Sequence, residues 1–277
     1  MRKFLIVLTI IFLMTGVALS QVAFKLNGGM AYISGNDLNN GIQGFNDWLA
    51  ANATDATGQR KKLTTGMNFG GEILYNLTEN SAIGLGINYF KISRNNEVSY
   101  TIPPGWPGSI KEKPEIKVIP ITLNFYYFFP VSSTINLYIK IGGGYYLTTF
   151  DYEQYSSSIF GEGTDTLHVS KGVVGFQGGA GIEIPLASSI SFIVEGSGRY
   201  ATISELVGDW TSRGTSILGS WDKSGTGALW YGKDTLNGVS YPWIAVNPTA
   251  PGWLENPAVA SLNISGFTAS AGIKIGF

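Results

Sequence analysis

The chain has 277 residues, no cysteine, one histidine (His168), and 18 Lys and Arg against 19 Asp and Glu. Without cysteine it has no disulfide, no thiol nucleophile and no Cys-metal site, and a lone histidine excludes a multi-histidine metal site. We therefore predict no metal and no other cofactor. The near-neutral net charge gives no indication of nucleic-acid binding. Charged residues make up only 13% of the chain, aromatic residues another 13%, and there are 37 glycines.

The amino-terminal stretch has the layout of a secretory signal peptide. Two basic residues precede an apolar run from Phe4 to Met14, and small residues follow as far as Ser20. Such a run is too short for a membrane-spanning helix, which needs about 20 residues. An uncleaved anchor helix is the alternative. We predict a signal peptide over 1–20, cleaved near Ser20-Gln21, and one domain over 21–277. This pattern is compatible with a secreted β-protein or an outer-membrane barrel.

Eight segments alternate between apolar and polar side chains with a period of two, which is typical of β-strands. Aliphatic and aromatic residues occupy one face, and Gly, Asn, Ser, Thr and charged residues occupy the other. Pro120 removes a ladder donor from the fourth segment, where a bulge is the simplest accommodation. The predicted strands are Val22–Ser34, Lys62–Leu77, Ala82–Ser93, Ile116–Phe129, Ile135–Thr149, Gly172–Leu186, Ile190–Ile203 and 261–277.

The connections between these strands alternate strictly between short and long. Three are short turns, at 78–81, 130–133 and 187–189, and four are long loops, at 35–61, 94–115, 151–171 and 204–261. Structureless loops of that length are unusual in a compact soluble domain. Alternation places all four long loops at one end and both termini at the other, which is the outer-membrane barrel pattern.

We predict an all-β fold, an eight-stranded antiparallel up-and-down transmembrane β-barrel with four long loops at one end and three short turns at the other. The apolar faces contact lipid, and the last strand pairs with Val22–Ser34, because lipid offers no partner to an open strand edge. The alternative is a soluble, lipocalin-like barrel with its apolar face inward. An eight-stranded interior is only just wide enough for side chains, too narrow for that many large residues.

The final strand carries the sharpest motif. A polar residue, a glycine and two apolar residues spaced by two end the chain, as Ser270, Gly272, Ile275 and Phe277. This arrangement resembles the carboxyl-terminal assembly signal of bacterial outer-membrane proteins. The resemblance implies recognition by the barrel-assembly machinery, with Ile275 and Phe277 as the residues read. The whole architecture resembles the eight-stranded OmpA/OmpX/OmpW-type families, which implies an integral protein of a Gram-negative outer membrane, surrounded by its lipid.

Charged side chains recur on the predicted inner face. A charge in a narrow lumen is tolerable only when it is paired or hydrated. The lumen is therefore either plugged by a network of ion pairs, with Glu195 and Arg199 two inward positions apart, or lined as the selectivity surface of a small pore. The seven residues are Lys25, Glu72, Lys140, Glu183, Glu195, Arg199 and Lys274.

All seven tryptophans fall in the predicted long loops, and five fall in the last one. They are compatible with anchoring and packing at the membrane interface. Rigid aromatic residues among Ser, Gly and Asn also resemble recognition surfaces, which predicts an extracellular ligand at the long loops. The five are Trp210, Trp221, Trp230, Trp243 and Trp253.

His168 and Ser170 continue an outward face near a loop end. This pair resembles the lipid A deacylase family, although Lys171 follows where the family has Asn, and no orienting carboxylate is identifiable on that face. We predict no enzymatic activity. The predicted function is a structural or surface-interaction barrel. The alternatives are a narrow channel or an OmpW-like path for small or hydrophobic solutes and, more remotely, an outer-leaflet lipid-modifying enzyme.

Overall fold

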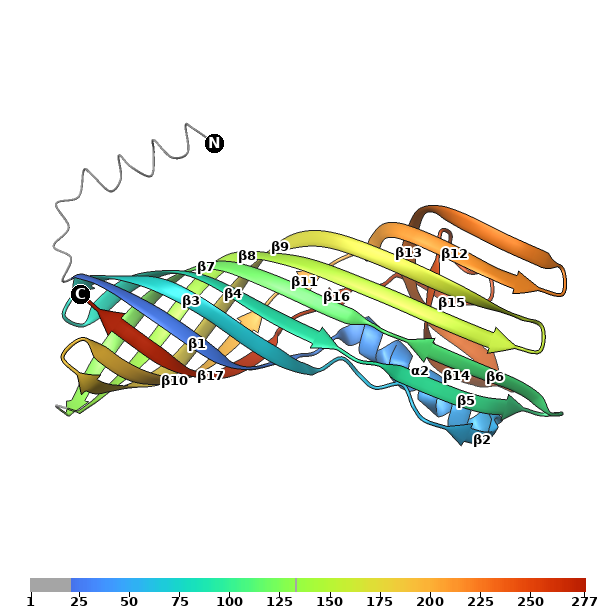
Figure 1. Ribbon diagram of the computed structural model, residues 1–277, viewed down its shortest axis with the longest axis horizontal. Coiled ribbons are helices and arrows are strands. Elements are labelled where there is room, and N and C mark those ends of the chain that lie inside the picture. Colours follow the sequence, from blue (N-terminus) through green and yellow to red (C-terminus); the bar gives the residue numbers. More distant parts are fainter. Residues whose placement is uncertain (1–20, 133) are drawn as a thin grey trace.

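The computed structural model describes residues 21–132 and 134–277 (Figure 1). The predicted signal peptide and Ser133 of the second turn lie outside the described residues. No helix among them is long and apolar enough to cross a membrane. The elements are α2 (Asn36–Asn52), β1 (Val22–Ile33), β2 (Thr54–Thr57), β3 (Thr65–Thr78), β4 (Ser81–Ser93), β5 (Asn96–Ile102), β6 (Trp106–Glu112), β7 (Glu115–Ser132), β8 (Ile135–Ser158), β9 (Gly161–Ala187), β10 (Ile190–Tyr200), β11 (Thr202–Ile203), β12 (Val207–Ser216), β13 (Gly219–Leu236), β14 (Val239–Asn247), β15 (Glu255–Val259), β16 (Leu262–Asn263) and β17 (Gly266–Gly276).

The strands form an antiparallel, barrel-like structure, which confirms the predicted all-β class. The pairing runs from β9 through β10, β17, β1, β3, β4 and β7 to β8, and β8 also pairs with β9. The first and last strands meet as predicted, with Phe24 opposite Ile275. The turns after β3, β7 and β9 lie at one end, together with the carboxyl terminus (Figure 1). We call this the turn end.

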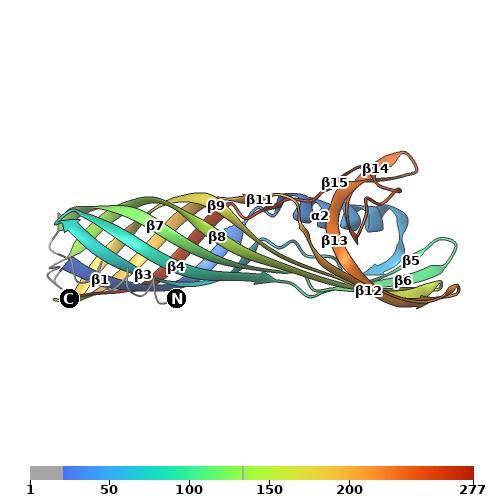
Figure 2. The same ribbon diagram turned by 90° about the horizontal axis from the view of Figure 1, so that it is seen from above.

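The predicted count of eight strands is wrong, because the described residues contain seventeen. Most of the additional strands and α2 occupy the segments predicted as loops and form a second body beyond the barrel wall (Figures 1 and 2), whereas β11 and β16 lie within the predicted seventh and eighth strands. We call residues 34–64, 94–114, 151–171 and 201–265 the distal part. The alternation used to predict strands depends on an apolar outer face. Strands of the distal part have the reverse arrangement, with polar residues exposed and apolar residues buried, as at Glu97 and Val98 of β5.

The largest single error concerns the predicted loop 151–171. The structure instead continues β8 to Ser158 and begins β9 at Gly161, so the two strands form one long hairpin. Its first half belongs to the barrel wall and its second half to the distal part (Figure 1). Ser and Thr are abundant in this segment, and their hydroxyl groups are compatible with a solvated strand.

The ends of two other predicted strands also differ. The seventh and eighth are each divided, and their outer pieces, β11 and β16, pair with each other as a separate two-stranded sheet. The expected bulge at Pro120 is absent. Pro120 lies opposite Tyr146 without a shift in register, and the pairing of β7 with β4 is interrupted beside it, between Ile121 and Val118. The backbone N–H that Pro120 lacks therefore leaves a local gap in the hydrogen-bond ladder between β7 and β4.

Side chains on the barrel wall alternate as predicted. Phe267 and Ile273 of the last strand are 58% and 41% exposed, whereas Lys274 between the outward positions contacts Glu183 inside. Aromatic rings lie at both ends of the apolar outer band, with Phe24 against Phe277 at the turn end and Tyr32 against Phe267 at the other. Such girdles are typical of membrane-spanning barrels.

Helix α2 lies beyond the barrel strands (Figure 2), and its Leu38 and Ile42 belong to one buried cluster with residues of those strands. Its buried residues Leu38, Ile42, Phe45 and Leu49 recur at helical spacing and form one apolar face. The side chain of Asn39 accepts a hydrogen bond from the backbone N–H of Leu63 and donates one to its carbonyl. This periodicity is visible in the sequence and is the signal by which the helix could have been found.

Single-cysteine substitutions can test the orientation, because the native chain has no cysteine. We expect probes at positions 273 and 275 to be quenched by a lipid-soluble quencher, and a probe at 274 to be protected from it, because side chains alternate with period two. Fluorescence quenching in liposomes measures this. Quenching at 274, with protection at 273 and 275, would contradict the register.

Candidate functional site

Four of the predicted inward charges meet inside the barrel. Glu195 contacts both Lys25 and Lys140, the latter at 2.5 Å, and Lys25 lies 3.7 Å from Glu72. The four residues come from β1, β3, β8 and β10, so the cluster crosses the interior from wall to wall. Two ammonium and two carboxylate groups balance in charge. A buried ionic cluster is tolerable only when it is balanced and fully hydrogen-bonded.

Tyrosine and amide groups complete this cluster. The hydroxyl of Tyr126 donates to Glu72 at 2.5 Å, and that of Tyr138 donates to Glu195 at 3.0 Å. Asn124 donates to Glu72 at 2.8 Å and accepts a hydrogen bond from Gln177 at 2.7 Å. These residues fill the space that the many inward glycines leave.

The other three predicted lumen residues lie apart from this cluster. Lys274 pairs with Glu183 nearer the turn end, at 2.5 Å. Arg199 does not pair with Glu195, although the two lie two inward positions apart on β10. Its guanidinium instead donates to the carbonyls of Tyr32 and Ile264 and lies over the ring of Phe90. Glu195 pairs with Lys25 and Lys140 instead.

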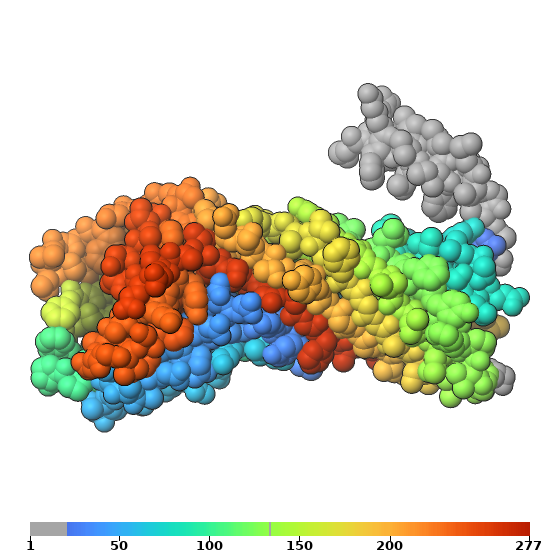
Figure 3. All heavy atoms as spheres, turned by 180° about the vertical axis from the view of Figure 1, so that it is seen from behind, coloured from blue at the N-terminus to red at the C-terminus, as the bar shows by residue number. Residues whose placement is uncertain are grey.

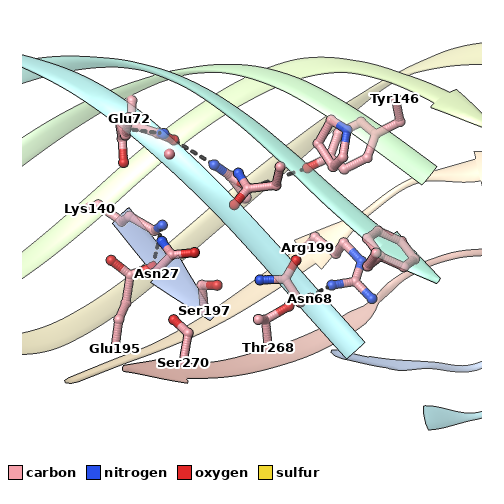
Figure 4. A pocket seen from close by; sticks show the side chains of 16 residues that line it. Asn27, Asn68, Glu72, Lys140, Tyr146, Glu195, Ser197, Arg199, Thr268 and Ser270 are labelled. Carbon is pink, nitrogen blue, oxygen red and sulfur yellow. Dashed lines mark hydrogen bonds and ion pairs between the residues drawn. The ribbon is translucent and has the colours of Figure 1, made fainter. Parts of the chain in front are cut away.

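A small polar cavity lies between the charge cluster and Arg199 (Figure 4). Asn27, Asn68, Ser197, Thr268 and Ser270 contribute to its lining. Its volume of about 40 Å³ is enough for roughly three water molecules. The cavity is therefore too small to be a continuous channel.

Apolar side chains fill the interior beyond Arg199, which corrects the expectation of a polar lumen along its whole length. Each of these residues is at most 2% exposed, and they form one core with Leu38 and Ile42 of α2. The residues from the barrel strands and their extensions are Ala31, Ile33, Phe90, Ile92, Ile116, Val118, Tyr146, Phe150 and Val169. These residues lie on the same inward face as the lumen charges, so the predicted alternation of inward and outward side chains holds here. Polar side chains are predicted at these inward positions, and the structure places apolar ones there.

A second buried ion pair, which sequence reasoning missed, stabilises the distal part. Arg60 donates to Glu112, and both contact the hydroxyl of Tyr152, while Asn96 donates to Glu112 at 2.7 Å. Burial alone would raise the pKa of Glu112, but the guanidinium of Arg60 and the hydrogen bonds outweigh it and lower the pKa. The two charged residues are distant in sequence and lie outside every predicted strand.

The predicted loop tryptophans lie mainly in strands and do not form one group. Trp243 contacts Trp253 and Trp48 at ring separations of 6.1 and 5.7 Å. Trp210 and Trp221 line a cleft with Trp253, whereas Trp230 donates its N–H to the carbonyl of Asn247. All five belong to the distal part, outside the barrel wall.

His168 has a carboxylate partner that sequence reasoning did not identify. Its Nδ1 lies 2.6 Å from Asp151, which stands directly opposite on β8. Asp151 also pairs with Lys117, which in turn pairs with Glu115. Ser170 is exposed on the same face, but its hydroxyl is not hydrogen-bonded to His168 in the described part of the chain. The histidine therefore belongs to a surface ion cluster on β7, β8 and β9.

The residues of the predicted assembly signal lie on β17 and just beyond it. Ile275 is opposite Phe24 and Gly272 opposite Asn27, while Ser270 faces the polar cavity. The backbone N–H of Phe277 donates to the carbonyl of Val22 at 3.1 Å. The last residue thus extends the contact between the two ends of the described chain.

The model of the outer membrane protein beta-barrel domain family matches residues 4–214. The chain belongs to this family. It is therefore an outer-membrane β-barrel protein.

Two solved structures resemble this outer-membrane barrel protein. The outer membrane protein OprG from Pseudomonas aeruginosa is 12% identical, with a TM-score of 0.37 over 92% of this chain and 95% of OprG. A major outer membrane protein from Thermus thermophilus is 10% identical, with a TM-score of 0.42 over 92% of this chain and 99% of that one. No curated protein matches the chain.

We expect the buried pair Arg60–Glu112 to make the distal part of this barrel protein less stable in acid. The pKa of Glu112 is lowered in the folded state, so its stabilising contribution is present above its ordinary pKa of 4.5 and is lost as the pH falls through the folded value. We expect Glu112→Gln to destabilise the distal part by about 3–5 kcal/mol at neutral pH, because Arg60 then stays buried without its counter-charge. Hydrogen exchange of residues 53–64 and of β5 and β6 measures the change.

Glu97→Gln is the matched control, because Glu97 lies on the same hairpin in an exposed pair with Lys111. We expect it to leave the protection of these residues almost unchanged, because solvent screens an exposed ion pair. Equal loss of protection in the two variants would contradict the assigned role of Glu112.

Proposed function

We propose that the eight strands β1, β3, β4, β7, β8, β9, β10 and β17 form a closed transmembrane barrel without an open pore, and that it carries the distal part at the cell surface for interaction with external molecules. Outer-membrane barrels have short periplasmic turns and longer extracellular connections. The turn end is therefore periplasmic and the distal part extracellular.

The observation that carries this proposal is the succession of two blocks along the interior. The first is the charge-balanced cluster of Lys25, Glu72, Lys140 and Glu195, whose side chains are all largely buried. The second is the apolar core that joins the barrel interior to α2. An ion would have to break the first block and then enter an apolar region, which offers no replacement for its hydration shell.

The alternatives receive less support. A narrow channel or an OmpW-like path needs a continuous or lateral opening, and the interior cavity of about 40 Å³ lies between the two blocks. A lipid-modifying enzyme needs an activated Ser170. Asp151 and His168 instead share an ion cluster with Lys117, and we propose that this cluster contacts lipid head groups beside the apolar band.

Electrical recordings test the closed barrel. We expect the wild-type protein in planar bilayers to show no steady conductance, and Arg199→Ala to lower the unfolding midpoint without opening a pore, because the apolar core remains intact. Val194→Ala, which removes only methyl groups from the lipid-facing side of the same strand, is the control. A steady, ion-selective conductance of the wild type would refute the closed barrel and favour the channel.

We also propose that the chain is exported to a Gram-negative outer membrane after cleavage near Ser20-Gln21 and is inserted there by the barrel-assembly machinery. The terminal residues support this proposal, because Phe277 is 61% exposed and its ring packs on Phe24, at the edge where β17 meets β1. An assembly factor would therefore bind the exposed Phe277 ring before β17 pairs with β1.

Deletion of Phe277, or Phe277→Asp, tests the assembly proposal. We expect either variant to accumulate in the periplasm and be degraded, because the terminal strand would no longer be recognised. Immunoblots of separated membrane and periplasmic fractions measure this. Phe267→Asp, ten residues upstream on the same outward face, controls for the general cost of a lipid-facing charge. Normal outer-membrane yield of the Phe277 variants would contradict the proposal.

A further inference from the structure

The distal extension of the β8–β9 hairpin continues sideways into β12 and β13 and forms one antiparallel sheet. Its register places Gln154, Asp165, Ser212 and Lys223 in a single row across four strands. Because they lie directly opposite one another, all four side chains leave the same face of the sheet. This row combines a carboxylate, an amide, a hydroxyl and an ammonium group.

A tryptophan lies flat beside this polar row. Trp221 of β13 stands opposite Gly214 of β12, and Gly214 stands opposite Gly163 of β9. A Cβ built on Gly214 would collide with the Trp221 ring, and one on Gly163 would lie 2.9 Å from it. The indole therefore covers both glycines and rests on the sheet. Its N–H donates to Ser212 at 2.9 Å, which fixes the orientation of the ring.

Residues from β14 and the segment after it form the opposite wall. Asn247 and Trp253 face the row across a cleft of about 460 Å³, within the size range of small-ligand sites. A smaller hollow of about 190 Å³ adjoins it and shares Asp165 and Trp253 with it. β12–β15 lie at this end of the molecule, with α2 beside them (Figures 2 and 3).

One acceptor in the cleft is partly withdrawn from water. Burial raises the pKa of the Asp165 carboxyl, a shift that its hydrogen bond with Ser212 opposes. Asp165 lines the cleft, so a hydroxyl donor of a bound polar ligand would reach it and satisfy it. Trp210 also lines the cleft, but its indole N–H is closed off from it within the part of the chain that the structure describes.

We propose that this cleft binds a saccharide chain at the cell surface. A sugar ring has C–H groups on its faces and hydroxyl groups around its rim. It therefore matches a flat indole beside a row of mixed donors and acceptors, whereas a purely apolar ligand would leave Asp165 and Lys223 unpaired. The chain would stack on Trp221, present its hydroxyls to Asp165 and Lys223, and be enclosed by Trp253.

This inference rests on the proposed surface-interaction function and names its ligand class. The two can fail separately, because conductance reports on the barrel interior and binding reports on the cleft. A conducting barrel that binds a saccharide would overturn only the closed lumen. A closed barrel without saccharide binding would overturn only the cleft.

Titration calorimetry of the full folded chain in detergent micelles tests the proposal. The probes are maltotetraose, cellotetraose, chitotetraose and the delipidated core oligosaccharide of lipopolysaccharide. We expect at least one probe to bind, and Trp221→Ala and Asp165→Asn each to weaken its binding at least tenfold. Binding of the core oligosaccharide alone identifies the cell's own surface glycan as the source, and binding of another probe identifies an external glycan.

Matched controls keep the test specific. Trp106→Ala removes a 47% exposed tryptophan remote from the cleft, and Asp222→Asn changes the exposed neighbour of Lys223 on the opposite face of β13. We expect both variants to bind as the wild type does. Absence of binding for all four probes, or equal weakening in the controls, would overturn the proposal.

A glycine pair tests the indole platform itself. Gly163→Ala places a methyl group against the Trp221 ring, whereas Gly225→Ala adds one where no atom lies within 4 Å. We expect only Gly163→Ala to weaken binding, because it displaces the ring while retaining every polar group of the row. Unchanged binding by Gly163→Ala, with thermal unfolding like that of Gly225→Ala, would refute the platform.

Discussion

The antiparallel pairing of β8 with β9 is the interaction on which the rest of the structure depends. It runs without a shift in register from Asn136 opposite Glu183 to Ser158 opposite Gly161. Its first half satisfies backbone groups that would otherwise face lipid as an open edge. Its second half extends beyond the apolar band, where the other edge of β9 pairs with β12. The barrel wall and the distal sheet are therefore successive parts of one ladder, which fixes the distal part relative to the barrel.

Two chemically different groups of side chains fill the barrel interior, one ionic and one apolar. Where inward positions are glycine or small polar residues, Lys25, Lys140 and two glutamates occupy the space as a balanced cluster. Where they are Phe90, Ile92 or Ile116, the interior becomes an ordinary apolar core shared with α2. The ionic part is weak evidence for stability, since buried ion pairs bring costly desolvation. The apolar part supplies the hydrophobic stabilisation and links the barrel to the distal part.

Sequence reasoning succeeded where lipid imposes a simple rule and failed where it does not. The register of Phe267, Ile273 and Lys274 followed from alternation alone, because a slip by one residue would expose the charge to hydrocarbon. The extension of β8 beyond Thr149 still alternates at Phe150 and Tyr152, but its apolar face is the buried inner one and not a lipid-facing one. The Ser-rich stretch that follows, 156–158, shows no alternation. Helix α2 had a readable periodicity, but the expectation of a long loop between strands concealed it.

The sequence by itself determined the antiparallel barrel, the ends at which its turns and long connections lie, and the face on which each wall residue stands. Those properties follow from local alternation and connection length. Only the tertiary structure decided that Glu195 meets Lys25 and Lys140 rather than Arg199, that Arg60 finds Glu112, and that Trp221 rests on Gly163 and Gly214. Each of these contacts joins residues brought together by strand register and twist. Neither composition nor period contains that information, because many pairings would satisfy the same pattern and only packing in three dimensions selects one.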